Sequence, residues 1–102
     1  MAFLNNPPPI RAYDFMHYVY FIKSISTNKL YVGFTKDLRR RFSEHNNKQG
    51  GKYTKNKGPF RLVYYEAYSS DKDARKREDN LKLHKKAYTQ LKKRISVSLI
   101  EP

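Results

Sequence analysis

Residues 17–34 read HYVYFIKSISTNKLYVGF, two runs of β-branched and aromatic residues joined by a short polar segment. Runs of this composition favour β-strands. We therefore expect one strand over residues 17–25 and a second over residues 29–34. The Ser-Thr-Asn link between them has the residue types of a turn and is short, so the two strands are predicted to form an antiparallel hairpin.

Side chains alternate across a β-sheet, and this alternation divides the predicted hairpin into two faces. Tyr20 and Ile22 fall on one face, opposite to Phe21. In the second strand, Tyr31 and Gly33 share a face. Two tyrosines are therefore expected to stand together on the same side of the hairpin.

A helix is predicted to follow the hairpin over residues 36–46, with Thr35 as its N-terminal cap. Arg41 and His45 lie four residues apart in it and form one row along the helix, next to an apolar stripe. The helix ends before a glycine-containing loop over residues 50–59.

The second half of the chain begins with a predicted third strand over residues 60–68. Ser69 or Ser70 then starts a long helix, in which four residues recur at helical spacing: Ala74, Glu78, Leu81 and Lys85. A final helix is expected from about Tyr88. The order β-β-α-β-α-α predicts an α/β fold, a small three-stranded antiparallel sheet flanked by helices.

The length of 102 residues suits one compact domain. Residues 1–12 contain three consecutive prolines, which favour extended backbone, so we interpret them as a flexible leader. The domain itself is then expected to occupy residues 13–102.

Charge is the strongest signal in the composition. Lysine and arginine number 22 against 9 aspartates and glutamates, and the formal net charge is +13. A field of this sign attracts polyanions. Because tyrosines suited to stacking on bases lie among the basic residues, nucleic acid is the expected partner, and a basic protein of the ribosome is the alternative. No long apolar run suggests a membrane partner.

Cysteine is absent, which excludes disulfides and thiolate metal sites. Its absence fits a reducing compartment, and we expect a cytoplasmic protein of the bacterial cytosol or nucleoid. Two further sites are excluded by spacing. The glycine loop lacks the residues of a phosphate-binding Walker motif, and the histidines do not have the spacing of a zinc site.

Five residues whose side chains are suited to catalysis follow one another at characteristic spacings in the sequence. Tyr20 ends a Tyr-Val-Tyr segment, Tyr31 opens a Tyr-Val-Gly segment eleven residues later, and Arg41 and His45 follow on one helix, with Glu78 on a later one. In this order and spacing, from about residue 18 to residue 91, the chain resembles the GIY-YIG nuclease superfamily. The resemblance is close to the small single-domain branch related to the nuclease module of the bacterial repair excinuclease.

One departure from the pattern lies in the first motif, where Tyr18 and Val19 stand in place of the glycine and isoleucine of the family name. Such substitutions are common in the small branch, and these are not positions to which the family assigns chemistry. Tyr20 retains the tyrosine of that motif.

The resemblance implies a divalent-metal-dependent DNA endonuclease. Glu78 would ligate a single Mg²⁺ or Mn²⁺ ion and Tyr20 would act as general base. A phenol needs nearby cations to lower its pKa for that role. Tyr31, Arg41 and His45 would hold the scissile phosphate and the attacking water. Since phosphate contacts carry no sequence information, we expect cleavage that is weakly sequence-specific or directed by DNA structure, as in DNA repair. The protein is expected to be a monomer or a weak homodimer.

Each of these residues also has an ordinary structural interpretation, and Glu78 in particular is placed to pair with Lys82 on the helix surface. The alternative function is therefore a non-catalytic nucleic-acid-binding module with the same fold. The DNA could be branched or single-stranded, and RNA is not excluded. Residues predicted to contact nucleic acid are Lys36, Arg39, Arg40, Lys52, Tyr53, Lys55 and Lys82.

Overall fold

The computed structural model describes residues 15–47 and 54–101. The predicted leader, residues 1–12, lies outside the described residues. The elements are β1 (His17–Ser24), β2 (Leu30–Thr35), α1 (Leu38–Asn46), β3 (Phe60–Tyr68), α2 (Asp71–Leu83), α3 (Lys85–Arg94) and α4 (Ser96–Ile100). The predicted order β-β-α-β-α-α is confirmed, and the short α4 follows it.

The three strands form one antiparallel sheet in the order β2-β1-β3, so β2 is an edge strand. The hairpin turn follows Ser24, whose hydroxyl accepts a hydrogen bond from the backbone N–H of Thr27 at 3.1 Å. Asn28 completes the turn with a φ of 62°, a conformation that asparagine tolerates better than most residues. The predicted hairpin is confirmed.

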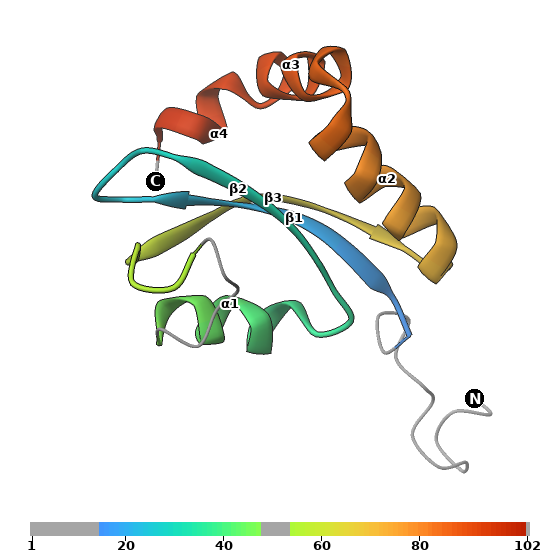
Figure 1. Cartoon of the computed structure of the whole chain (residues 1–102), viewed down its shortest axis with the longest axis horizontal. Coiled ribbons are helices and arrows are strands. Elements are labelled where there is room, and N and C mark those ends of the chain that lie inside the picture. Colours follow the sequence, from blue (N-terminus) through green and yellow to red (C-terminus); the bar gives the residue numbers. More distant parts are fainter. Residues whose placement is uncertain (1–14, 48–53, 102) are drawn as a thin grey trace, which may run out of the picture.

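Helices cover both faces of the sheet: α2, α3 and α4 lie over one face and α1 lies over the other (Figure 1). The larger core, on the side of α2 and α3, is built on Val19, Phe21, Ala74, Leu81, Leu91 and Ile95. The smaller core, on the side of α1, contains Tyr20, Ile22 and Phe60, with Tyr31, Leu38, Phe42 and Leu62 packed against them. The predicted placement of Tyr20 and Tyr31 on one face is thus confirmed.

The cap of α1 is Asp37, and the prediction that Thr35 caps this helix was wrong. The Asp37 side chain accepts a hydrogen bond from the backbone N–H of Arg40 at 3.1 Å. Thr35 is still paired with Tyr18 in the sheet, and its hydroxyl accepts a hydrogen bond from the backbone N–H of Asp37. Since Thr35 belongs to the strand, the helix begins only at Leu38.

In the second half of the chain, the long helix α2 begins where it was predicted to begin. Its row of residues at helical spacing, predicted to reach Lys85, ends earlier. Of the two serines expected to start the helix, Ser70 caps α2 by accepting a hydrogen bond from the backbone N–H of Asp73 at 3.3 Å. The helix ends at Leu83 because His84 is extended, with φ −121° and ψ 104°. Lys85 therefore begins α3 instead of continuing the stripe of α2. The final helix predicted from about Tyr88 thus begins earlier, at Lys85, and ends at Arg94, before the short α4.

A half-buried carboxylate, that of Glu66, fixes α2 to the sheet. Glu66 of β3 accepts hydrogen bonds from Arg77 Nε and Nη2 at 2.9 and 3.0 Å, from the Tyr64 hydroxyl at 2.7 Å, and from the Tyr68 hydroxyl. Arg77 directly precedes Glu78, so this network also fixes the turn of α2 that carries Glu78. Within the described part of the chain, no helix is long and apolar enough to cross a membrane.

Candidate active site

A pocket of about 690 Å³ lies at the edge of the sheet formed by β2. It takes residues from β1, the hairpin turn, β2, α1, the segment before β3, α2 and α3. Helices α1 and α2 can both contribute because they lie on opposite faces of this edge strand (Figure 1). All five residues predicted to be catalytic line it: Tyr20, Tyr31, Arg41, His45 and Glu78. Side chains more than fifty residues apart in the sequence therefore meet around one space.

Tyr20 reaches the pocket by lying across its neighbour strand. It pairs with Gly33 of β2 and is 2% exposed. A β-carbon at Gly33 would stand 2.8 Å from Tyr20 Cε1 and closer still to Cζ and the hydroxyl oxygen. Only glycine leaves this space, so Gly33 determines where the phenol lies.

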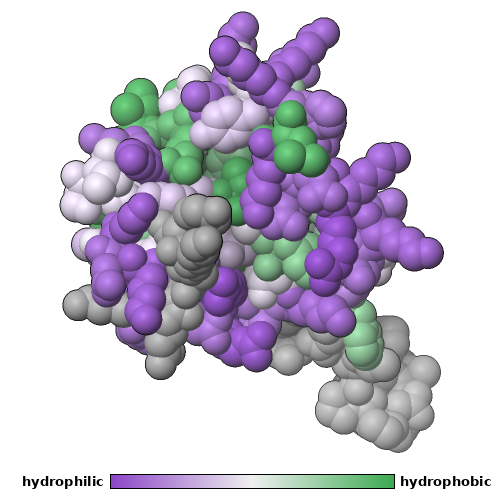
Figure 2. All heavy atoms as spheres, in the orientation of Figure 1, coloured by the Kyte–Doolittle hydropathy of each residue, from purple (hydrophilic) through white to green (hydrophobic). Residues whose placement is uncertain are grey.

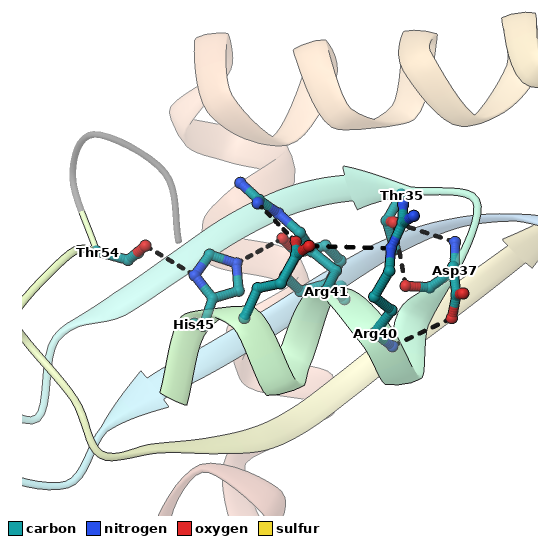
Figure 3. A network of polar contacts seen from close by, with 8 residues as sticks. Thr35, Asp37, Arg40, Arg41, His45 and Thr54 are labelled. Carbon is teal, nitrogen blue, oxygen red and sulfur yellow. Dashed lines mark hydrogen bonds and ion pairs between the residues drawn. The ribbon is translucent and has the colours of Figure 1, made fainter. Parts of the chain in front are cut away.

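A hydrogen-bonded chain of three side chains begins at Tyr20. Its hydroxyl oxygen is 2.8 Å from His45 Nε2. On the other side of the ring, His45 Nδ1 is 2.7 Å from Thr54 Oγ1 (Figure 3). All three residues are buried. Next to His45, Asn46 Oδ1 accepts a hydrogen bond from the backbone N–H of Phe60 at 2.7 Å, which ties the end of α1 to the start of β3. This contact holds His45 and the Thr54 segment together.

The pKa shifts in this chain have clear directions. Burial lowers the pKa of His45 below its ordinary 6.5, and the charge of Arg41 adds to this effect. Burial raises the pKa of Tyr20 above 10.0, although Arg41 acts against it through a hydrogen bond and its charge. The expectation that nearby cations lower the pKa of Tyr20 is therefore not met in the protein alone, since burial outweighs Arg41.

With both side chains neutral, we assign the protons as follows. Arg41 has only N–H donors, so the phenol oxygen accepts from it, and the phenol proton is available to a neutral His45. His45 Nε2 is then the acceptor and Nδ1–H donates to Thr54 Oγ1. In this arrangement the Nε2 atom of His45 can act as a base toward the hydroxyl group of Tyr20.

Arg41 lies between this phenol and a carboxylate of its own helix. Its Nη1 donates a hydrogen bond to Glu44 Oε1 at 3.1 Å, and Arg40 Nε is 3.9 Å from Glu44 Oε2. Figure 3 shows the two arginines side by side on α1. Glu44 thus orients the guanidinium of Arg41 at the pocket wall.

The hydroxyl group of Tyr31 is buried and has no hydrogen-bond partner in the described part of the chain. Its ring packs edge-on against Phe60, with centroids 5.8 Å apart. A buried hydroxyl without a partner costs free energy, and native structures rarely keep one without a reason. Its position in the pocket lining suits binding of a water molecule or a phosphate oxygen.

Glu78 is the one carboxylate among the described residues that line the pocket. Its side chain is 16% exposed, and Lys82 Nζ lies 2.8 Å from its Oε2. Oε1 has no hydrogen-bond partner in the described residues. No group of three or more potential metal ligands occurs in that part of the chain. A Mg²⁺ ion held by one carboxylate, with water and substrate phosphate as its other ligands, fits this donor set.

Of the residues predicted to contact nucleic acid that the structure describes, one lines the pocket and the others are exposed elsewhere on the surface. Lys36, Arg39, Arg40 and Lys55 are exposed, and Lys82 lines the pocket, whereas Lys52 and Tyr53 lie outside the described residues. Hydrophilic residues dominate the face shown in Figure 2. Sequence reasoning missed Lys29 and Lys57, two further basic residues of the pocket lining, and Thr54, the partner of His45. No local pattern in the sequence links Thr54 to His45, which lies nine residues earlier.

Two tyrosines, an arginine, a histidine and a glutamate around one basic pocket are the features of a nuclease-type domain. The model of the GIY-YIG catalytic domain matches residues 16–94. The chain therefore belongs to the GIY-YIG family, and the resemblance noted in the sequence is confirmed.

Similar proteins come from bacteria. A UPF0213 protein of Staphylococcus aureus is 44% identical over 77 residues, which cover 76% of this chain and 88% of that protein. A UPF0213 protein of Staphylococcus saprophyticus is 44% identical over 66 residues, covering 65% of this chain and 79% of that protein. The solution NMR structure of a UPF0213 protein from Bacillus halodurans is 38% identical and covers 74% of this chain and 81% of that chain, with a TM-score of 0.47.

Proposed function

We propose that the chain is a divalent-metal-dependent endonuclease that hydrolyses phosphodiester bonds in DNA, with weak sequence specificity or direction by DNA structure. The observation that carries the proposal is the meeting of Tyr20, Tyr31, Arg41, His45 and Glu78 around one pocket. Membership of the GIY-YIG family supports a nuclease-type activity. The net charge of +13 supports a polyanionic substrate.

Proton transfer is assigned to the Tyr20–His45 pair. As a water molecule attacks the phosphorus atom, its proton passes to the Tyr20 oxygen while the phenol proton passes to His45 Nε2. This transfer needs no free phenolate, which agrees with the raised pKa of Tyr20 and the lowered pKa of His45. The hydroxyl group of Thr54 accepts the Nδ1–H of His45 and keeps Nε2 free as the acceptor.

The remaining pocket residues are assigned to the phosphate. Arg41 presents a planar guanidinium that hydrogen-bonds to phosphoryl oxygens and neutralises their charge. The buried hydroxyl of Tyr31 lacks a partner in the described residues, so a phosphate oxygen or the attacking water would satisfy it. The leaving oxygen departs as the P–O bond breaks and takes its proton from solvent.

Glu78 is proposed to hold the single Mg²⁺ or Mn²⁺ ion through its carboxylate. When bound, such an ion polarises a phosphoryl oxygen and stabilises charge on the leaving oxygen. Lys82 is placed to keep Glu78 ordered through Oε2 and to face the same phosphate.

A non-catalytic nucleic-acid-binding module is the second candidate, and the ion pair between Glu78 and Lys82 is the observation that favours it. The two are separated by nicking of supercoiled plasmid with Mg²⁺ or Mn²⁺ against EDTA. The endonuclease proposal expects nicking that requires the metal and ceases in EDTA. DNA binding without any nicking under either condition would support the module instead.

We also propose the setting in which this activity operates. Residues 13–102 act as one nuclease domain, monomeric or weakly dimeric, in the bacterial cytosol or nucleoid. The bacterial origin of the relatives supports this location.

A further inference from the structure

Two tyrosines outside the pocket stand on the same sheet face as Tyr20. Tyr65 of β3 is the direct register partner of Tyr20, and Tyr18 precedes Tyr20 by two residues on β1. The rings of Tyr18 and Tyr65 meet edge to face, with centroids 5.8 Å apart and planes inclined by 67°. They form a small aromatic surface directly beside the proposed catalytic tyrosine.

Core packing does not account for this pair. Tyr65 is 51% exposed, and neither tyrosine belongs to the two core clusters. Their hydroxyl groups make no hydrogen bond within the described residues. In contrast, the neighbouring Tyr64 and Tyr68 on the opposite face both donate to Glu66. An exposed ring, that of Tyr65, packed against the half-buried ring of Tyr18 is an arrangement typical of binding surfaces.

The surroundings of the pair favour a polyanion. Tyr18 pairs with Thr35, and the Thr35 hydroxyl accepts a hydrogen bond from Asp37, the cap of α1. The first turn of α1, with the exposed Arg39 and Arg40, therefore begins at this end of the sheet. Aromatic rings beside basic side chains are the combination that binds single-stranded nucleic acid, because bases stack on the rings while cations neutralise the phosphates.

We propose that Tyr18 and Tyr65 form a stacking surface for an unpaired base of the DNA strand whose phosphate occupies the pocket. A base inside a duplex already stacks on both sides, so only an unpaired base can present a face to these rings. The proposal rests on DNA being the ligand of the proposed function and deepens it, since it names the substrate class: DNA that is unpaired next to the cleaved bond.

The test measures binding by fluorescence anisotropy with the full-length chain in EDTA, so that cleavage does not interfere. The two probes are a fluorescein-labelled oligothymidylate and an abasic strand of the same length, which keeps the phosphates and lacks the bases. Tyr65→Ser should weaken binding of the oligothymidylate by about tenfold and leave binding of the abasic strand unchanged. Tyr65→Phe, which keeps the ring, should bind both strands as the wild type does.

Leu83→Ser is the matched control, because it removes an apolar side chain that is 74% exposed on α2. It should leave both affinities unchanged, and circular dichroism verifies the fold of each variant. Undiminished binding of the oligothymidylate by Tyr65→Ser would overturn the stacking surface. An equal loss on both strands would also overturn it, since the contact would then be to phosphate. A change in sedimentation of Tyr65→Ser with unchanged DNA affinity would assign the surface to a second copy of the chain.

The outcomes also separate this inference from the proposed function. If the wild type nicks plasmid in Mg²⁺ but Tyr65→Ser retains full affinity for the oligothymidylate, only the stacking surface fails. If the wild type binds neither strand, the proposal of a DNA-directed protein fails and the stacking surface fails with it.

Discussion

The ring of Tyr20 lies against the backbone of Gly33, its register partner on the edge strand β2. This contact lets a residue of the central strand extend its hydroxyl group to a pocket at the edge of the sheet. There the hydroxyl is within hydrogen-bond distance of His45, which α1 supplies from one face. Gly33 of the Tyr-Val-Gly segment thus leaves the space that the ring of Tyr20, from the Tyr-Val-Tyr segment, occupies.

Gly33→Ala is expected to displace the phenol of Tyr20, because the added methyl group would overlap its ring. Cleavage should fall by about 10²- to 10⁴-fold, as for Tyr20→Phe, since either change removes the general base. A more decisive measurement compares the nicking rate of Tyr20→Phe with that of the double variant that also carries Gly33→Ala. Once Tyr20→Phe has removed the hydroxyl group, adding Gly33→Ala should reduce the nicking rate little further.

Tyr88→Phe is the control for this series, since Tyr88 lines the same pocket and has no assigned step. Its nicking rate should match the wild type. If Tyr20→Phe itself cleaves at the wild-type rate while folded, the general base is another residue, and Tyr31 or His45 takes that role.

Thr54→Val should reduce cleavage by about tenfold or more, because it leaves the Nδ1–H of His45 without its acceptor. An unsatisfied buried donor costs about 1–3 kcal/mol, which favours moving the proton to Nε2. ¹⁵N chemical shifts of the His45 ring should report this change of tautomer, a readout that a merely structural role of Thr54 would not produce. Thr54→Ser should restore both the tautomer and the rate. An unchanged tautomer in Thr54→Val would contradict the assigned role.

The nicking rate should depend on the protonation of His45. Its folded pKa lies below 6.5, so the imidazole is neutral above that value and loses its acceptor nitrogen as the pH falls through the lowered pKa. We therefore expect full activity above about pH 6.5 and an acid limb below it. NMR titration of the ring checks this directly. Arg41→Gln should move the ring pKa upward, since the Arg41 charge helps to lower it.

Glu78→Gln should abolish nicking at ordinary Mg²⁺ concentrations while DNA binding in EDTA persists or tightens slightly. The change keeps size and helix compatibility but removes the charge that holds the cation. If Glu78 only pairs with Lys82, its loss costs about 0.3–0.5 kcal/mol and leaves any cleavage intact. Asp79→Asn is the matched control, an exposed carboxylate of α2 outside the pocket lining, and should nick normally. Undiminished nicking by Glu78→Gln would refute the metal assignment.

The network around Glu66 should make stability depend on acid. Burial alone would raise the pKa of Glu66, but hydrogen bonds from Arg77, Tyr68 and Tyr64 hold it below 4.5. The contribution of the carboxylate to stability is therefore present above pH 4.5 and is lost as the pH falls through the lowered pKa. Urea unfolding between neutral and acid pH should show this loss. Glu66→Gln should be less stable at pH 7 and less sensitive to acid; an equal slope in both proteins would contradict the assignment.

Local patterns in the sequence were enough for the strands, the alternation of Tyr20 and Tyr31 and a serine cap at residue 69 or 70. These features depend on residues near one another in the chain, where strand preference and helix spacing act directly. The membership of Glu78 in the site was inferred only through the resemblance, because nothing near it in the sequence distinguishes it from a surface glutamate paired with Lys82.

The tertiary structure decided what depends on distant contacts. Thr35 does not cap α1 because it is paired in the sheet with Tyr18. Thr54 became the partner of His45 because the segment before β3 folds back onto α1. The pKa of Tyr20 rises because burial outweighs the nearby Arg41, a balance that appears only once the chain is packed. The spacing of the motifs in the sequence predicted which residues belong to this site. Burial and long-range contacts in the folded chain determine the protonation of these residues and their hydrogen-bond partners.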